Sequence, residues 1–323
     1  MTNKQITYLV FGIVLVLAII VDLGLFTKKN KTISLKNALY TSIFWIVLGL
    51  GFAVFVWFED GKTYAIEYIS AYLMEKSLSI DNIFVFILIF SAFNVKEQFF
   101  GRVLFAGVLM AIIFRIIFIT VGVALVERFE WILYIFGAFL LYTGVKMFVA
   151  DEDGEKDPHD YAAYKWIKKV IPMVPHDGNG KYVVRENGKR KYTILFVVVL
   201  MLAFIDIVFA VDSIPAVMGI SREPMVIYTS NIFAVLGLRS LFFLLRGAAD
   251  KFDYLQQGIA VVLVFIGLKM LGAHWLNQWL SKDQQVVLSL AVIVLCISVS
   301  IWYSIHKKKK GVPEEVEDGS IDL

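Results

Sequence analysis

The chain has 323 residues and a formal net charge of +3; 59% of its residues are hydrophobic, 18% are charged, and the mean hydropathy is +0.74. Soluble domains contain about half apolar and about a quarter charged residues, so this composition excludes an ordinary soluble protein and indicates a polytopic membrane protein. The small net charge gives no reason to expect a nucleic-acid partner. The single cysteine, Cys296, excludes a disulfide within the chain and a cysteine-based metal or redox centre.

Apolar runs of about 20 residues, the length of a membrane-spanning helix, recur along the whole chain. They cover residues 6–26, 38–58, 64–93, 102–126, 131–149, 192–219, 224–246, 254–273 and 285–305. The first run is a full span long and lacks a small-residue cleavage site, so we expect an uncleaved helix rather than a signal peptide. The sequence therefore predicts an all-α polytopic membrane protein with nine transmembrane helices.

Basic residues are concentrated in alternate loops. The segments that follow spans 1, 3, 5, 7 and 9 hold 21 Lys and Arg residues, whereas the segments on the other side hold 5. Basic segments stay in the cytoplasm during membrane insertion. This distribution predicts that the N-terminus lies outside and the C-terminus lies in the cytoplasm.

The one sizeable soluble piece covers residues 151–191, on the predicted cytoplasmic side. Its acidic start, residues 151–157, lacks the ligand spacing of a calcium-binding EF-hand loop, so we expect a solvated turn there. Residues 181–192 place Asn187 and Gly188 between strand-like flanks, which predicts a small β-hairpin. The acid-rich tail after Lys310 is expected to be disordered.

Two of the apolar runs contain acidic residues in the same pattern: an acid, a second acid six residues later, and then an amide or a hydroxyl. The two sets are Glu75, Asp81 and Asn82 in the third run and Asp206, Asp212 and Ser213 in the sixth. An acid at the centre of a membrane span costs about 2.5–3.5 kcal/mol, so partners must hold it there. Ionisable groups in a span favour a functional site, although buried salt bridges with basic residues inside the spans would also account for them.

Alignment of the two acidic stretches reveals an internal repeat. Arg115 then aligns with Arg239, and residues 140–147 align with residues 263–270. Spans 3–5 therefore match spans 6–8, and the odd number of spans in each unit makes the second unit inverted. Inverted repeats with a binding site near the midplane are a recurrent transporter architecture.

The predicted units follow from this repeat. They are an N-terminal two-helix segment (residues 1–63), repeat 1 (64–150), the cytoplasmic loop with its hairpin (151–191), repeat 2 (192–274), the last helix (275–306) and a disordered cytoplasmic tail (307–323).

The six-residue spacing of the acids predicts a break in each helix. On a continuous α-helix, residues six apart lie about 120° apart around the axis, so the two acids would not share one face. We therefore expect an unwound turn near Ser77 and Ser79 in the first repeat and near Ser213 and Pro215 in the second. Proline lacks an N–H, so Pro215 would leave the carbonyl of Val211 free to bind an ion.

Carboxylate, amide and hydroxyl oxygens are the ligands that hard divalent cations prefer. The predicted ligands are Glu75, Asp81, Asn82, Asp206, Asp212 and Ser213, with Asn231 and Asp22 as further candidates. We expect Arg115 and Arg239 to neutralise the acids when no cation is bound. No histidine lies within the repeat cores, which disfavours copper and thiolate-type zinc sites, and no organic cofactor is expected. The usual metalloprotease, serine-hydrolase and P-loop motifs are also lacking, so we do not expect an enzyme.

The same residues resemble the signatures of a known family. The segments Glu75-Lys76-Ser77-Leu78, Asp212-Ser213 and Ser230-Asn231 are similar to motifs of the TerC family of bacterial membrane proteins, and the long loop is similar to that of the Alx-type branch. The resemblance implies membership of the superfamily of small-solute exporters typified by the lysine exporter, a bacterial plasma (inner) membrane location and manganese(II) efflux. It also implies that Glu75, Asp81, Asp206 and Asp212 are ion ligands.

The sequence therefore predicts a transporter that exports a hard divalent cation, manganese(II) first, through a midplane carboxylate site in the lipid bilayer. Protons would compete for that site and could drive the exchange. Two alternatives stay open: a metallation or assembly partner that works with the secretion translocase, and a purely structural cluster of salt bridges. Ligand hardness alone does not separate manganese from calcium, magnesium or iron.

Overall fold

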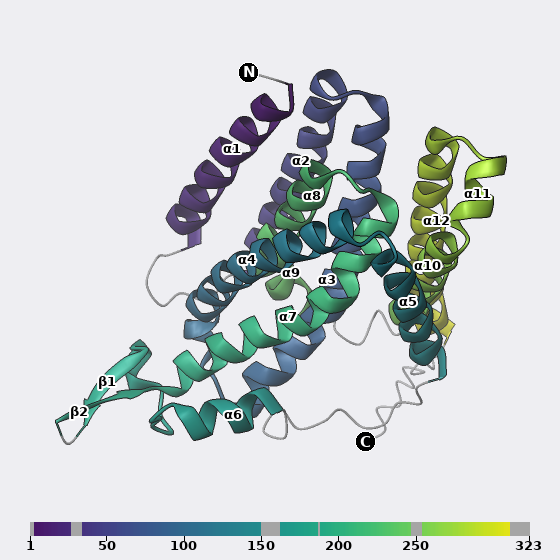
Figure 1. The fold of residues 1–323 in the computed structure, drawn as a ribbon. Coiled ribbons are helices and arrows are strands. Elements are labelled where there is room, and N and C mark those ends of the chain that lie inside the picture. Colours follow the sequence, from purple (N-terminus) through teal and green to yellow (C-terminus); the bar gives the residue numbers. More distant parts are fainter. Residues whose placement is uncertain (1–2, 27–33, 150–161, 187, 247–253, 311–323) are drawn as a thin grey trace, which may run out of the picture.

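The computed structural model describes residues 3–26, 34–149, 162–186, 188–246 and 254–310 (Figure 1). Within these ranges the chain is nearly all helical and contains one small β-hairpin. The prediction of an all-α protein is thus confirmed at this level. Each of the nine predicted spans coincides with a helix or, for residues 224–246, with a pair of helices.

The helices of the bundle follow one another along the chain. They are α1 (Asn3–Phe26), α2 (Leu35–Glu59), α3 (Lys62–Ala92), α4 (Glu97–Arg128), α5 (Ile132–Val149), α7 (Ile194–Ile220), α8 (Pro224–Leu236), α9 (Leu238–Leu245), α10 (Leu255–Leu271), α11 (Ala273–Trp279) and α12 (Lys282–Lys310). The remaining elements are α6 (Ala162–Val170), the 3-10 turn η2 (Gly178–Gly180) and the strands β1 (Val183–Glu186) and β2 (Lys189–Tyr192).

Four of the described helices, α2, α4, α7 and α12, are long and apolar enough to cross a membrane. The number rises to six if each bent pair counts as one span, namely α8 with α9, bent by 41°, and α10 with α11, bent by 82°. The described apolar parts of α1 and α5 are shorter. Helix α3 is long, but it carries several charged residues. Length and composition therefore support four to six spans, and nine spans stay a prediction.

The two ends of the bundle differ in what they carry. Figure 1 shows the α2–α3 turn and the start of α1 at the top, whereas α6 and the β-hairpin lie at the opposite end. We call these the turn end and the loop end. Gly61, with φ of +104°, sits between α2 and α3 in a backbone conformation that favours glycine, and this lets the chain reverse at once. The turn end corresponds to the predicted outside.

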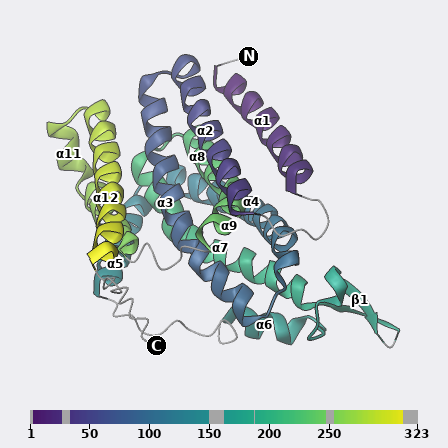
Figure 2. The same cartoon turned by 180° about the vertical axis from the view of Figure 1, so that it is seen from behind.

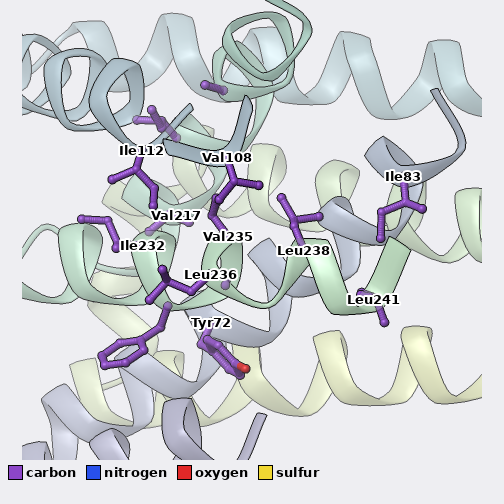
Figure 3. Packing of buried hydrophobic residues seen from close by; sticks show 14 of the residues in the cluster. Tyr72, Ile83, Val108, Ile112, Val217, Ile232, Val235, Leu236, Leu238 and Leu241 are labelled. Atoms are coloured by element: carbon purple, nitrogen blue, oxygen red, sulfur yellow. The ribbon is translucent and has the colours of Figure 1, made fainter. Parts of the chain in front are cut away.

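The core lies where the helices of the two predicted repeats interleave. Helix α3 packs against α8, α4 against α7, and α5 against α10. Figure 3 shows buried side chains from several of these helices in contact, among them Tyr72, Val108 and Val217. Figure 2, seen from behind, shows α1 at one side of this core and α12 with α11 at the other. Both views place α3, α4, α7, α8 and α9 in the middle, and the buried charged side chains Glu67, Glu75, Arg115, Asp206 and Arg239 come from these helices.

Helices α5 and α10 approach each other through glycine. A methyl group added at Gly267 would lie 2.7 Å from the carbonyl oxygen of Gly137, and one added at Gly144 would lie 2.9 Å from that of Ala260. These distances leave no room for a side chain. The two backbones are therefore in direct contact, as is common where membrane helices pair through small residues.

The predicted β-hairpin is present. Strands β1 and β2 pair antiparallel, with Val183 opposite Tyr192 and Glu186 opposite Lys189. Gly188 adopts φ of +74° in the turn, as the Asn-Gly pair predicted, while Asn187 lies outside the described residues. The predicted solvated turn at residues 151–157 and the tail after Lys310 also lie outside them, so those two predictions are untested.

The predicted helix breaks are wrong. Both α3 and α7 are continuous through the acidic stretches. The hydroxyl of Ser77 donates to the carbonyl of Leu73 at 2.8 Å, so it satisfies its own helix instead of opening it. Pro215 lies inside α7 without ending it. The break lies instead at Gly237, between α8 and α9.

Candidate functional site

Arg115 is at the centre of a buried charged cluster. It lies in the middle of α4, and its side chain is 1% exposed. Its Nε and Nη2 atoms donate to the two carboxylate oxygens of Asp206 on α7, both at 2.9 Å. This fork-to-carboxylate geometry is the strongest form of an arginine ion pair.

The third nitrogen of the guanidinium, Nη1, bonds to residues on two further helices. Nη1 of Arg115 donates to Oε1 of Glu75 on α3 and, at 3.0 Å, to Oδ1 of Asn231 on α8. The amide nitrogen of Asn231 donates to the carbonyl of Ile227 at 3.0 Å, which turns its oxygen toward Arg115. One arginine thus joins α3, α4, α7 and α8. We call Glu75, Arg115, Asp206 and Asn231 the central cluster.

The charges of the central cluster do not balance. Two carboxylates face one guanidinium, so one negative charge is in excess when both acids are ionised. An uncompensated charge away from water is costly, and a proton or a cation would remove the imbalance. Oε2 of Glu75 is buried and has no hydrogen-bond partner among the described residues. Ser213 lies beside Glu75, and its hydroxyl is buried.

The structure brings together only part of the predicted ligand set. Glu75, Asp206, Ser213 and Asn231 are close to one another, and Asn82 is buried further along α3. The side chains of Asp81, Asp212 and Asp22 lie outside the described residues, although their positions fall within α3, α7 and α1. Among the side chains that are described, no group of three or more His, Cys, Asp or Glu residues is placed to hold a metal ion. The predicted four-acid site is therefore untested.

The two aligned arginines have different surroundings. Arg239 lies in the first turn of α9, two residues after Gly237, and it is buried. Its guanidinium lies over the ring of Phe105, 5.6 Å from the centroid. It also lines a small cavity with Leu236 and Val108. Of the two arginines predicted to neutralise the acids, Arg115 is the one seen bonded to Glu75 and Asp206.

Lys76 has a role that the sequence did not reveal. Its Nζ donates to the carbonyl of Ala234 at 3.1 Å. In a continuous helix that carbonyl would accept from the N–H of residue 238, and the bend at Gly237 makes it available instead. A cation at the end of α8 is also favoured by the helix dipole. The only signal in the sequence was the position of Lys76 next to Glu75.

Glu67 is a buried acid that sequence reasoning missed. It lies on α3, eight residues before Glu75, and it is fully buried. It accepts a hydrogen bond from the hydroxyl of Ser221, the C-cap residue of α7. Its place near the start of the span is also typical of an acid that faces the lipid headgroups. A usable signal is the helical spacing of Glu67, Ala71 and Glu75, which puts all three on one broad face.

At the loop end, the segment between α6 and α7 is tied to the α3–α4 turn. Nζ of Lys96 lies 2.6 Å from the carboxylate of Asp177, and the hydroxyl of Tyr182 donates to the carbonyl of Arg102 at 3.1 Å. The hydrogen bond from Lys96 holds the pKa of Asp177 below its ordinary value. In the same segment, a hydrogen bond from His176 lowers the pKa of Glu186.

Comparison with known proteins agrees with this membrane architecture. The sequence model of the integral membrane protein TerC family matches residues 59–311 of this chain. An uncharacterized membrane protein of Myxococcus xanthus is 41% identical over 288 residues, 89% of this chain and 88% of the relative. Proteins named Alx, membrane-bound redox modulator, are also similar: that of Salmonella typhi is 40% identical over 309 residues, covering 93% and 95% of the two chains. That of Escherichia coli strain K12 is 39% identical over 310 residues, covering 93% and 96%.

The search of solved structures found no significant match. The family match covers well over half of the chain, and these relatives are matched over most of their own length. The chain belongs to the TerC family of integral membrane proteins.

Proposed function

We propose that this protein is a transporter that exports a hard divalent cation, manganese(II) first, across the plasma (inner) membrane of a bacterium. The observation that carries the proposal is the charge imbalance of the central cluster. Arg115 fills the place of a cation between Glu75 and Asp206 and still leaves one negative charge in excess. A divalent ion that displaced the guanidinium would carry two positive charges and so balance the two carboxylates.

The atoms around Arg115 suit such an ion. The carboxylates of Glu75 and Asp206, the carbonyl oxygen of Asn231 and the hydroxyl of Ser213 are all hard oxygen donors. Protons compete for the same carboxylates, which provides a way to couple export to proton uptake. Asp81, Asp212 and Asn82 remain proposed ligands in the same spans, and Asp22 remains a further candidate.

The packing supports two inverted repeats among nine spans. In the repeat alignment Gly144 corresponds to Gly267, and Gly137 corresponds to Ala260. Gly144 lies against the carbonyl of Ala260, and Gly267 lies against the carbonyl of Gly137. Exchange of the two repeats therefore converts the first contact into the second. Exchange of the repeats likewise converts the packing of α4 against α7 into the packing of α8 against α3. A pseudo-two-fold axis between the repeats accounts for these relations.

Flux of individual metal ions in proteoliposomes, with and without a pH gradient, tests the proposal. Asp206→Asn and Glu75→Gln are expected to abolish manganese(II) flux, while Glu127→Gln, at an exposed acid on α4, is the control and should transport normally. Asp81→Asn and Asp212→Asn should each abolish manganese tolerance in a host that lacks its own exporter. Unchanged flux in both central-cluster variants would overturn the assignment.

A second function is favoured by the name of the relatives. The Alx proteins are named as membrane-bound redox modulators. This chain has one cysteine and therefore no dithiol of its own, so a redox role would act through metal supply rather than thiol exchange. Supply of metal to exported proteins, in contact with the secretion translocase, is that alternative. Recovery of the translocase with this protein and poorly metallated exported enzymes in its absence would favour it.

A further inference from the structure

Helices α3 and α7 each carry a line of buried, mostly polar or small side chains. The residues are Glu67, Ala71, Glu75, Ser79 and Asn82 on α3, and Asp206, Ala210, Ser213, Val217 and Ser221 along α7 and its C-cap, all no more than 3% exposed. Their spacing of three and four residues puts each set on one face of its helix. The two helices pack against each other.

The two lines meet in one seam. At the turn end, Ser221 donates to Glu67; further in, Ser213 lies beside Glu75. Each step covers eight residues on both helices, which corresponds to about 12 Å at the helical rise. Between the central cluster and the turn end, the residues of the two lines are small or polar except Val217.

Toward the loop end the same interface is apolar. On α3 the buried residues are Phe86, Ile89 and Phe90, and on α7 they are Leu195, Val198 and Leu202. The ring of Phe90 packs at a tilt against the rings of Phe100 and Phe242, with centroids 4.5 and 5.3 Å away. A cation at Glu75 and Ser213 would thus find oxygen donors toward the turn end, whereas the buried side chains named here beyond Asn82 and Asp206, toward the loop end, are hydrocarbon.

Glu67 has a basic neighbour of its own. Lys269 on α10 lies near enough to act on Glu67 electrostatically, and its ammonium donates to the hydroxyl of Ser289 on α12 at 2.9 Å. A purely structural tie between α3, α10 and α12 would explain this pair. Such a tie would not explain why Glu67 lies on the seam, in line with Glu75. It would also not explain why Glu67 accepts a hydrogen bond from Ser221, the last residue of the α7 line.

We propose that Glu67 and Ser221 form a second binding station for the transported cation, on the release side of the central cluster. This inference rests on the proposed function. The cation passes from Glu75 and Ser213 along the seam to Glu67 and Ser221 and leaves at the turn end. Lys269 balances the charge of Glu67 when the station is empty, as Arg115 balances the central cluster.

The test measures two quantities on the full-length protein: manganese(II) bound per chain in detergent, and manganese(II) flux in proteoliposomes. Glu67→Gln should retain binding at the central cluster but bind one ion fewer than the unaltered protein, and its flux should fall about tenfold, because a charged ligand is lost. Ser221→Ala keeps the acid and should show a smaller fall. Ser70→Ala is the matched control, because this buried hydroxyl donates to its own helix at the carbonyl of Ile66.

The outcomes separate the two claims. If the unaltered protein neither binds nor transports manganese(II), the proposed function fails. If it transports normally and Glu67→Gln is indistinguishable from it in flux and in bound ions, only the second station is overturned. Loss of all binding in Glu67→Gln, equal to that of Asp206→Asn, would also overturn it. If Glu67→Gln does not fold, Ser221→Ala decides, and unchanged flux in that variant counts against the station.

Discussion

The ammonium of Lys76 lies 3.1 Å from the carbonyl oxygen of Ala234, so α3 is tied directly to the bend between α8 and α9. Glu75, the preceding residue, is bonded to Arg115 on α4. Two adjacent side chains of α3 therefore bind two different helices. The consequence is that a movement of α3 changes both the central cluster and the bend.

Lys76→Met is expected to destabilise the protein by about 1.5–3 kcal/mol, the usual worth of a hydrogen bond to a charged group. The methionine keeps most of the apolar stem but leaves the carbonyl of Ala234 without its donor. Thermal unfolding in detergent measures the change. Lys146→Met, at an exposed position on α5, should leave the unfolding temperature almost unaltered, and an equal loss in both variants would contradict the role of the bond.

Gly237→Ala should disturb the same bond from the other side. A methyl group at residue 237 would lie 2.5 Å from Nζ of Lys76 and 3.1 Å from Cβ of Trp45, so the lysine must move away. The effects of Gly237→Ala and Lys76→Met should therefore be less than additive in the double variant, because both remove one interaction. Fully additive losses would show that the glycine acts independently of Lys76.

Arg115→Met removes the one described cation between two buried carboxylates. Removal of one partner from a buried ion pair costs about 3–5 kcal/mol, and here two acids lose their partner at once. Under the proposed function, manganese(II) should restore more stability to this variant than it adds to the unaltered protein. A melting curve with and without the metal tests this, and no difference between the two proteins would argue against a cation site at Arg115.

Gly267→Ala should cost about 1–3 kcal/mol, the usual range for overpacking, because its methyl group would meet the backbone of α5. Backbone atoms cannot move aside as a side chain can. Gly51→Ala on α2 is the matched control, since a methyl group there meets nothing within 4 Å. The two unfolding temperatures should differ clearly, and similar values would show that the α5–α10 contact is looser than described.

Acidification should release the segment that covers the α3–α4 turn. The pKa values of Asp177 and Glu186 are lowered in the folded protein, so their stabilising contribution is present above their ordinary pKa values and is lost as the pH falls through the lowered ones. Hydrogen exchange in residues 172–193 should therefore rise at a pH below the ordinary aspartate value of 3.8. Asp177→Asn should show faster exchange already at neutral pH.

The sequence identified the helices because hydropathy reports burial in lipid or protein regardless of tertiary detail. It also placed Arg115 against the acids, because a charge inside a span needs a partner. The position of the helix break was wrong for a local reason. Serine hydroxyls either open a helix or bond back to it, and only the structure shows that Ser77 does the latter, whereas a single glycine, Gly237, interrupts the helix.

Glu67 was missed because its burial depends on the end of another helix. An acid near the start of a span can reach the headgroups or be covered by protein; the spacing that puts Glu67 on the same face as Glu75 does not name the group that covers it. Ser221 belongs to the end of α7, 154 residues later. Contacts of this kind are set by how the helices pack, which no local pattern encodes.

The direct contact between α5 and α10 has one further consequence. Gly137, Gly144 and Gly267 have no side chains that could change rotamer, so at these positions the two helices meet backbone to backbone. Each helix ends one of the two proposed repeats. Under the proposed function, we expect the repeats to rotate about the line along which these helices touch, which would open the seam between α3 and α7 at one end and close it at the other.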